Sequence, residues 1–373
     1  MPKSREAAAS FDALVVVKTP LQILNALEAR HHFGFARPAL TLLTSRKFPR
    51  EMLLPLVDPA DWAAIRCFEL DPYRRPVRLP LVPAGANEEL AEIRWIAQQW
   101  RLRRRYTAFF RPWRGAADLV IGNYHQAHFR HLANLFRDSR CILVDDGTDT
   151  FRVAQARREL AAGALATPAP SPWRTPKKWW LASEVAWNVR PRKNLVFFST
   201  YDLDLAAADT LVRNRYEHAG RQIVANASDG RVLFLGQPLV EDGYLGRSDL
   251  RALLGDVRRS HTSQPLAYVP HPREDRAALA GVLGDCGIAM YEIGKPFEFH
   301  LLDSTSLPGT VASFFSSALD NCRLIWGNRI RLLAYRIAPE RLRTSREFVA
   351  EVYAYFASHG RGSIEILEPG QPA

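Results

Sequence analysis

The sequence has 373 residues, more than one hydrophobic core usually organises, which predicts two domains of ordinary size. Hydrophobic residues make up 47% of it and charged residues 24%, which excludes a disordered or fibrous chain. Lysine and arginine number 50 against 39 acidic residues, and the net charge of +11 predicts attraction to a polyanion: nucleic acid, anionic lipid or a phosphorylated substrate.

The four cysteines lie far apart and form no CxxC pair, which is typical of buried thiols in a reducing compartment. No segment approaches the roughly 18 to 20 apolar residues that span a bilayer. The apolar run at 13–17 is shorter than the core of a signal peptide. We therefore expect a cytoplasmic protein, either free or peripheral on the inner face of the membrane.

The first predicted elements alternate between strand and helix. An apolar run at 12–18 precedes Thr19-Pro20 and helically spaced leucines that end near Gly34, which predicts a buried strand entering a helix. Further predicted strands lie at 39–43, 119–122 and 141–144. This alternation predicts a parallel sheet with helices on both faces.

Residues 163–193 interrupt the alternation with five prolines and four tryptophans. We therefore expect an N-terminal domain at 1–165, a connecting segment at 166–193 and a C-terminal domain at 194–373. The predicted strands of the C-terminal domain are 195–199, 231–235, 266–269, 288–291, 310–315 and 323–326.

Two acidic pairs followed by glycine come after predicted strands. Asp145-Asp146-Gly147 directly follows 141–144, and a glycine turn there can aim one carboxylate at a ligand as a general base. Glu241-Asp242-Gly243 is a second pair of this kind. A solvated surface turn is the alternative interpretation of either pair.

His271 lies between Pro270 and Pro272, directly after the strand at 266–269. The two prolines stiffen the backbone, so the imidazole is well placed to donate to a phosphate oxygen or act as a general acid. A histidine that only fills a loop is the alternative.

Two further candidates lie nearer the C-terminus. Glu298 stands between aromatic residues in Pro-Phe-Glu-Phe and could accept the hydroxyls of a ribose, or be a solvated edge residue. Ser316 and Ser317 end an apolar run, where they could bind phosphate at a helix N-terminus or simply cap that helix.

His125, His128 and His131 are spaced three residues apart. On a helix this spacing drifts around the surface and does not converge on one metal ion, so we expect no metal site.

Two segments combine basic and aromatic residues. Residues 94–117 hold seven arginines and no acid, and residues 173–193 hold six basic residues and one acid. Together they account for the whole positive excess. This pattern favours an anionic membrane surface or an acidic acceptor over nucleic acid; the alternative is a solvated helix whose aromatic side chains face the core.

The motifs Asp-Asp-Gly, His-Pro, Pro-Phe-Glu and Ser-Ser follow one another in an order that resembles the motif series of bacterial sialyltransferases. Lys-Thr-Pro-Leu-Gln at 18–22 and Leu-Gly-Gln-Pro-Leu at 235–239 are similar to segments of the lipooligosaccharide sialyltransferases (glycosyltransferase family 52) and their capsular polysialyltransferase relatives. The resemblance runs from about residue 12 to 330, motif by motif.

The resemblance implies the α/β GT-B fold, with two Rossmann-like domains facing each other across a cleft. The N-terminal domain would lie on the acceptor side and the C-terminal domain would bind the CMP-activated sugar. It also implies an inverting transfer of sialic acid to a hydroxyl of a glycan or glycolipid such as lipooligosaccharide or capsule, with no metal and no other cofactor.

Residue roles carry over with the motifs. Asp146 or Asp145 would be the base, with Asp242 ranked third, and His271 would contact the donor phosphate. The remaining expected residues of the nucleotide-sugar site are Gly236, Gln237, Pro272, Glu298, Ser316, Ser317, Thr19 and Gln22.

Alternatives remain at this point. The donor could be CMP-Kdo or another CMP-nonulosonate. The protein could also form a homodimer. A nucleotide-binding protein that has lost transfer is a further alternative. A basic nucleic-acid-binding protein is a different class, but no helix-turn-helix, zinc-finger or RNA-recognition signature supports it.

Overall fold

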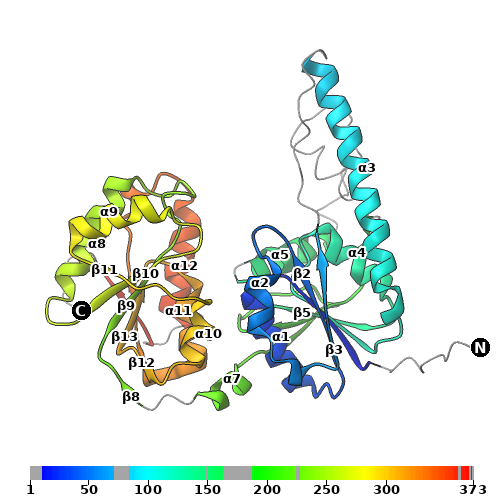
Figure 1. The fold of residues 1–373 in the computed structure, drawn as a ribbon, viewed down its shortest axis with the longest axis horizontal. Coiled ribbons are helices and arrows are strands. Elements are labelled where there is room, and N and C mark those ends of the chain that lie inside the picture. The colour runs from blue at the N-terminus through cyan, green and yellow to red at the C-terminus, as the bar shows by residue number, and fades with distance from the viewer. Residues whose placement is uncertain are drawn as a thin grey trace, which may run out of the picture. The chain divides into compact units, whose positions relative to one another are not determined.

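Figure 1 shows the fold in a computed structural model. The chain divides into two compact units, Met1–Asn214 and Arg215–Ala373, each with its own sheet and core. The residues that the structure describes are 11–70, 84–147, 149–162, 187, 189–223, 227–359, 363–368 and 371, with only the backbone at 84–94 and 96.

The described part of the first unit contains a seven-stranded parallel sheet in the order β3-β2-β1-β4-β5-β6-β7. The strands are β1 (Ala13–Val17), β2 (Ala39–Thr44), β3 (Ala64–Glu69), β4 (Asp118–Ile121), β5 (Arg140–Val144), β6 (Val196–Ser199) and β7 (Thr210–Arg213). The helices are α1 (Pro20–Phe33), α2 (Arg50–Leu53), α3 (Ala84–Phe110), α4 (Ala127–Leu135) and α5 (Asp149–Ala161).

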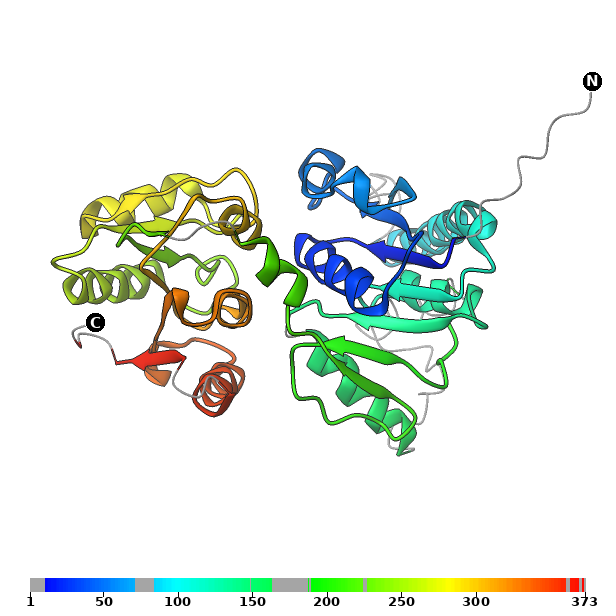
Figure 2. The same cartoon turned by 90° about the horizontal axis from the view of Figure 1, so that it is seen from below.

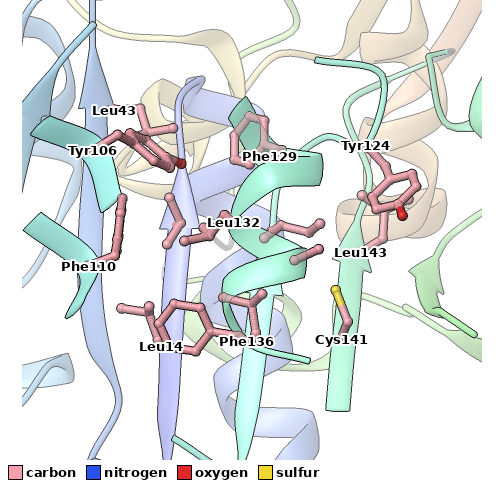
Figure 3. Close-up of a cluster of buried hydrophobic side chains, with 14 of the residues drawn as sticks. Leu14, Leu43, Tyr106, Phe110, Tyr124, Phe129, Leu132, Phe136, Cys141 and Leu143 are labelled. Atoms are coloured by element: carbon pink, nitrogen blue, oxygen red, sulfur yellow. The ribbon is translucent and has the colours of Figure 1, made fainter. Parts of the chain in front are cut away.

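The core of the first unit begins with a row of side chains across the sheet. The register places Leu14 of β1 opposite Ala39 of β2 and Leu119 of β4, and Leu119 opposite Cys141 of β5. All four belong to one buried cluster, which α3 and α4 cover with aromatic and leucine side chains (Figure 3). Alternate strand residues therefore build the face on which both helices pack.

Helix α3 carries the first basic and aromatic segment, 94–117, as far as Phe110, and a short 3-10 helix at Arg111–Trp113 continues it. Figure 1 shows α3 extending away from the sheet of its unit. Tyr106 and Phe110 are fully buried in the core, and Trp113 is 6% exposed. These aromatic residues face the core, as one of the two interpretations of this segment expected. The exposed basic side chains there are Arg101, Arg104, Arg105, Arg111 and Arg114. Most of the second segment, 173–193, lies outside the described residues.

The described part of the second unit holds a six-stranded parallel sheet in the order β11-β10-β9-β13-β14-β15, with a separate pair β12-β8. Figure 2 shows the helices of this unit packed beside its strands. The strands are β8 (Ala227–Ser228), β9 (Val232–Leu235), β10 (Leu266–Val269), β11 (Ala289–Met290), β12 (Ser306–Leu307), β13 (Thr310–Ser313), β14 (Arg331–Tyr335) and β15 (Ile364–Leu367). The helices are α7 (Glu217–Gln222), α8 (Arg247–Ser260), α9 (Arg276–Cys286), α10 (Phe297–Leu302), α11 (Ser317–Trp326) and α12 (Arg346–His359).

The boundary between the units lies later in the chain than 166–193. The predicted strand at 195–199 is β6, which pairs with β5 of the first sheet, and Phe197 is fully buried in the core of the first unit. Strand β7 then extends the same sheet, so the first unit runs to Asn214. The prediction that the C-terminal domain begins at 194 is therefore wrong.

The predicted strand at 323–326 is also wrong, because these residues form the last turn of α11. Ser316 caps this helix, and Leu319, Cys322 and Trp326 bury one face at helical spacing. The strands that follow, β14 and β15, were not predicted from the sequence.

Candidate functional site

The strand order of each sheet reverses at one point, where ligands of open α/β sheets usually bind, outside the carboxyl ends of the strands. In the first unit the reversal lies between β1 and β4. Thr19 and Gln22 follow β1, Asn123 follows β4, and Asp145-Asp146 follow β5. The predicted residues of the first unit therefore share one edge of its sheet.

Gln22 fills the reversal point of the first sheet. Its side chain is fully buried, and its Oε1 accepts a hydrogen bond of 2.8 Å from the backbone N–H of Lys18. A Cβ atom at Gly122, directly after β4, would lie 2.0 Å from that same Oε1. Only glycine at 122 therefore allows Gln22 this position.

Asp146 lies half-buried beside Gln22, and polar side chains hold its carboxylate. Thr19 Oγ1 donates to Oδ1 at 3.3 Å, and Asn123 Nδ2 donates to Oδ2 at 2.8 Å. Burial raises the pKa of Asp146, with a smaller contribution from the charge of Asp149, against the lowering effect of these hydrogen bonds. A fixed carboxylate with a raised pKa is suited to accept a proton.

Asn123 is itself fixed, because its Oδ1 accepts from the backbone N–H of His125 at 2.6 Å and of Gln126 at 3.2 Å. Lys18 adds a cation to this end of the sheet. Its Nζ donates to Gln126 Oε1 at 3.2 Å, and burial lowers the pKa of Lys18 although the charge of Asp146 opposes this. The first site therefore combines a carboxylate, an amide and a partly buried amine.

Asp145 has a different environment from Asp146. It is 3% exposed, and its Oδ2 accepts from the backbone N–H of Thr200 at 2.8 Å. Burial raises the pKa of Asp145 to about 6, although hydrogen bonds from Thr200, Ser199 and Thr150 work against this. Its carboxylate therefore joins β5 to the end of β6 inside the unit.

Of the three histidines of the i, i+3, i+6 pattern, His128 and His131 lie in α4 and His125 lies just before it. His125 is exposed, whereas His131 is 6% exposed and lies 2.9 Å from Thr107 Oγ1 of α3. Burial lowers the pKa of His131 to about 4, and that of His128 also falls well below its ordinary value because of burial. Both rings pack against Trp187 in the first unit.

The second sheet reverses its order between β9 and β13. Gln237, just after β9, bridges this point: its Oε1 accepts from Phe315 N at 3.0 Å and from Ser313 Oγ at 3.3 Å. Pro272 follows β10 and Ser316 follows β13, so the predicted residues meet at the carboxyl edge of three neighbouring strands.

His271 is held in a tight turn. The backbone N–H of Arg273 donates to its Nδ1 at 3.1 Å, so in the neutral ring the hydrogen lies on Nε2. Its own backbone N–H donates to Glu274 Oε2 at 2.6 Å. The ring is therefore held with Nε2–H as its donor, the arrangement that a phosphate oxygen requires.

The helix N-termini near this edge hold the remaining candidates. Ser316 Oγ accepts from Ala318 N at 3.3 Å as the N-cap of α11, and Ser317 is the first residue of that helix. Glu298, in the first turn of α10, accepts from Asn321 Nδ2 of α11 at 2.8 Å. Glu298 therefore lies against the helix that the two serines begin.

Asp242 differs from the other acidic candidates because its carboxylate is paired with an arginine side chain. Both of its oxygens accept from the guanidinium of Arg273, at 2.7 and 2.8 Å. Such a bidentate pair leaves the carboxylate poorly placed to take a proton from an incoming hydroxyl.

Three residues that hold the predicted ones were not predicted from the sequence: Asn123 beside Asp146, Glu274 beside His271, and Asn321 beside Glu298. Glu274 stands three residues after His271, and Asn123 directly follows a predicted strand, so both positions carried a signal. Asn321 lies inside a helix and became recognisable only through its contact.

The sequence matches no described protein family and no curated protein. Solved structures similar in fold include one of Medicago truncatula and one of Listeria monocytogenes. UGT71G1 of Medicago truncatula, in complex with UDP-glucose, gives a TM-score of 0.51 at 10% identity, covering 96% of this chain and 86% of that one. A protein of Listeria monocytogenes assigned as a UDP-N-acetylglucosamine 2-epimerase gives 0.50 at 11% identity, covering 96% and 84%. The chain has the predicted GT-B fold, with two Rossmann-like α/β units.

Proposed function

We propose that this protein is an inverting, metal-independent glycosyltransferase that moves sialic acid, or a related nonulosonic acid, from a CMP-activated donor to a hydroxyl of a cell-surface glycan. One observation carries the proposal. Each sheet has its ordered motif residues at the point where strand order reverses, a held carboxylate in the first unit and a fixed imidazole in the second.

In this proposal Asp146 is the base. Its carboxylate takes the proton from the acceptor hydroxyl while that oxygen forms a bond to the anomeric carbon of the donor. Half-burial and two fixed hydrogen-bond donors favour Asp146 over the buried Asp145 and the arginine-paired Asp242. Thr19 and Asn123 keep the carboxylate in place.

The second unit would hold the donor. As the bond between the anomeric carbon and the phosphate oxygen breaks, CMP leaves with the electron pair, and negative charge grows on its phosphate. Nε2–H of His271 and the hydroxyls of Ser316 and Ser317 would stabilise that charge, so the proposed step needs no divalent metal. Glu298 would accept the ribose hydroxyls.

The acceptor or an anionic membrane would meet the exposed arginines of α3. Trp100, on the same helix, is 51% exposed, and an exposed tryptophan among arginines fits a lipid headgroup region. Among the described residues, no helix is long and apolar enough to cross a membrane.

The direct test compares the thermal stabilisation of the protein by CMP, UDP, GDP and ADP. We expect CMP to stabilise most, and His271→Ala to remove the preference without changing the melting temperature of the unliganded protein by more than a few degrees. Equal stabilisation by CMP and UDP overturns the donor assignment. Release of CMP from CMP-sialic acid or CMP-Kdo in the presence of glycan then identifies the sugar.

A further inference from the structure

Two hydrogen bonds between Glu274 and His271 close the turn that carries His271. Glu274 Oε2 accepts from the backbone N–H of His271 at 2.6 Å, and the backbone N–H of Glu274 donates to the carbonyl of His271 at 3.0 Å. Pro270 and Pro272 fix the backbone on both sides of the histidine. The conformation of this turn therefore depends on the carboxylate of Glu274.

A strand of the sheet also holds the side chain of Glu274. It is 7% exposed, and its Oε1 accepts from the hydroxyl of Tyr268 at 2.6 Å; Tyr268 belongs to β10 and is fully buried. A Cβ atom at Gly236, after β9, would lie 2.3 Å from Glu274 Oε2 and 2.7 Å from the Tyr268 ring. Glycine at 236 therefore makes room for the pair, which links the ends of β9 and β10 to the turn.

The consequence reaches the imidazole through the backbone. Arg273 lies inside the turn, and its N–H sets the ring of His271 by donating to Nδ1. If the turn opened, the Arg273 N–H would move away from Nδ1. The neutral ring would then no longer be fixed in the tautomer that carries its hydrogen on Nε2.

We infer that Glu274 is a positioning residue of the donor site: by accepting from the His271 amide, it holds the turn and keeps the His271 ring ready to bind the phosphate of the donor. The identity of the ligand in this inference rests on the proposed function. The role of Glu274 in holding the turn is independent of it.

The experiment uses the full chain with four variants: Glu274→Ala, Glu274→Gln, Tyr268→Phe and Glu241→Ala. Glutamine keeps an acceptor for the His271 N–H and offers a donor to the Tyr268 oxygen, so it should rescue the turn. Glu241 is the matched control, because it is an exposed glutamate whose Oε1 also accepts from a backbone N–H, that of Asp275, at 3.0 Å.

Two quantities are measured: the Kd for CMP, and the rate of amide hydrogen exchange in the segment 271–274, which leaves out the Asp275 amide that Glu241 holds. We expect Glu274→Ala to raise the Kd about tenfold, because the N–H of the half-buried His271 loses its acceptor, and to speed exchange in the segment. Glu274→Gln, Tyr268→Phe and Glu241→Ala should leave the Kd within about threefold, although Tyr268→Phe lowers the melting temperature.

The outcomes separate the two proposals. If the wild type shows no preference for CMP, the proposed donor fails, and the exchange rate alone still decides whether Glu274 holds the turn. If the wild type prefers CMP but Glu274→Ala and Tyr268→Phe lose stability and CMP affinity equally, Glu274 has only a structural role. Unchanged exchange in Glu274→Ala overturns the inference in every case.

Discussion

Asp145 and Asp146 are neighbours in the chain, yet their carboxylates belong to separate hydrogen-bond networks. That of Asp145 accepts from Thr200 inside the first unit, whereas that of Asp146 accepts from Thr19 and Asn123 at the edge of the sheet. Successive residues of an extended chain point to opposite sides, so one carboxylate of the pair can fasten the sheet while the other remains available to a ligand.

Asp146→Asn should therefore abolish most of the turnover while CMP binding is unchanged. Loss of a general base typically costs a factor of roughly 100 to 10,000, and asparagine preserves the size of the side chain. Initial rates with CMP-sialic acid and a glycan acceptor, together with the Kd for CMP, measure the two effects. Asp145→Asn is the control and should keep turnover within about threefold, because its amide still offers an acceptor to Thr200. A larger loss in Asp145→Asn or Asp242→Asn would transfer the role to that residue.

Gly122→Ala should destabilise the first unit. The new methyl group would overlap Gln22 Oε1, and overpacking of this kind costs about 1 to 3 kcal/mol. Gly281→Ala provides the control, because Gly281 is an exposed glycine in α9 with open space around its Cβ position, and alanine there should stabilise by about 0.5 to 1 kcal/mol. Urea unfolding measures both. Equal effects of the two substitutions would show that Gln22 moves away without cost.

The positions of the strand ends were predictable because they follow from local patterns. The apolar run before Asp145 and the one before His271 each form a buried strand, and a parallel sheet brings such ends to one edge. The domain boundary was not predictable in this way. Strand β6 belongs to the first sheet because Phe197 lies opposite Leu143, a pairing of residues far apart in the chain that no local pattern encodes.

The partners of the site residues were equally hidden. Asn123 and Asp146 are separated by 23 positions in the chain, and so are Glu298 and Asn321, so only the folded sheet and helices bring each pair together. The aromatic residues around Arg105 show the reverse case. Their composition favoured a binding surface as strongly as a core, and the helical period of Tyr106 and Phe110 places both in the core.

Stability should fall as the pH rises from about 5 to 7 because of Glu274. Burial raises its pKa from the ordinary 4.5 to about 7, with Glu241 adding to the rise and Tyr268, the His271 amide and Arg276 opposing it. The folded state thus binds this proton more tightly than the unfolded state, so the stabilisation is complete below pH 4.5 and is lost as the pH passes 7. The difference corresponds to about 3 kcal/mol.

Comparison with Glu274→Gln isolates this contribution, because glutamine does not titrate. The free energy of unfolding of the wild type minus that of the variant should decrease between pH 5 and pH 8. A difference independent of pH would mean that the carboxyl of Glu274 ionises as easily in the folded protein as in the unfolded chain.

The two serines of α11 should separate capping from ligand binding. Ser316→Ala removes the acceptor for the Ala318 N–H and should cost about 1 kcal/mol of stability, whereas Ser317→Ala should cost less than about 0.5 kcal/mol. If both hydroxyls bind the donor phosphate, both variants raise the Kd for CMP although only Ser316→Ala melts earlier. Unchanged CMP affinity in both would assign Ser316 to the helix cap alone and remove Ser317 from the site.

The arginines of α3 should bind vesicles that contain anionic lipid. Arg101, Arg104 and Arg105 are exposed on a helix whose aromatic side chains Tyr106 and Phe110 are buried, so replacing the arginines by glutamine changes the charge and leaves these two aromatic residues in place. One core contact changes with it, because the Arg105 guanidinium lies 5.9 Å from the centre of the Phe68 ring. Each basic residue near an anionic surface contributes about 1 kcal/mol, so the triple variant should bind phosphatidylglycerol vesicles roughly 100-fold more weakly.

The matched control for α3 removes three positive charges elsewhere in the first unit. It replaces the exposed residues Arg37, Arg137 and Arg152 by glutamine. Co-sedimentation with phosphatidylglycerol vesicles and with pure phosphatidylcholine vesicles measures the partition coefficients. A local docking surface predicts that only the α3 variant loses binding, because attraction falls off within a Debye length of the membrane. Equal losses in the two triple variants would instead mean that the membrane responds to net charge, and α3 would have no special part in docking.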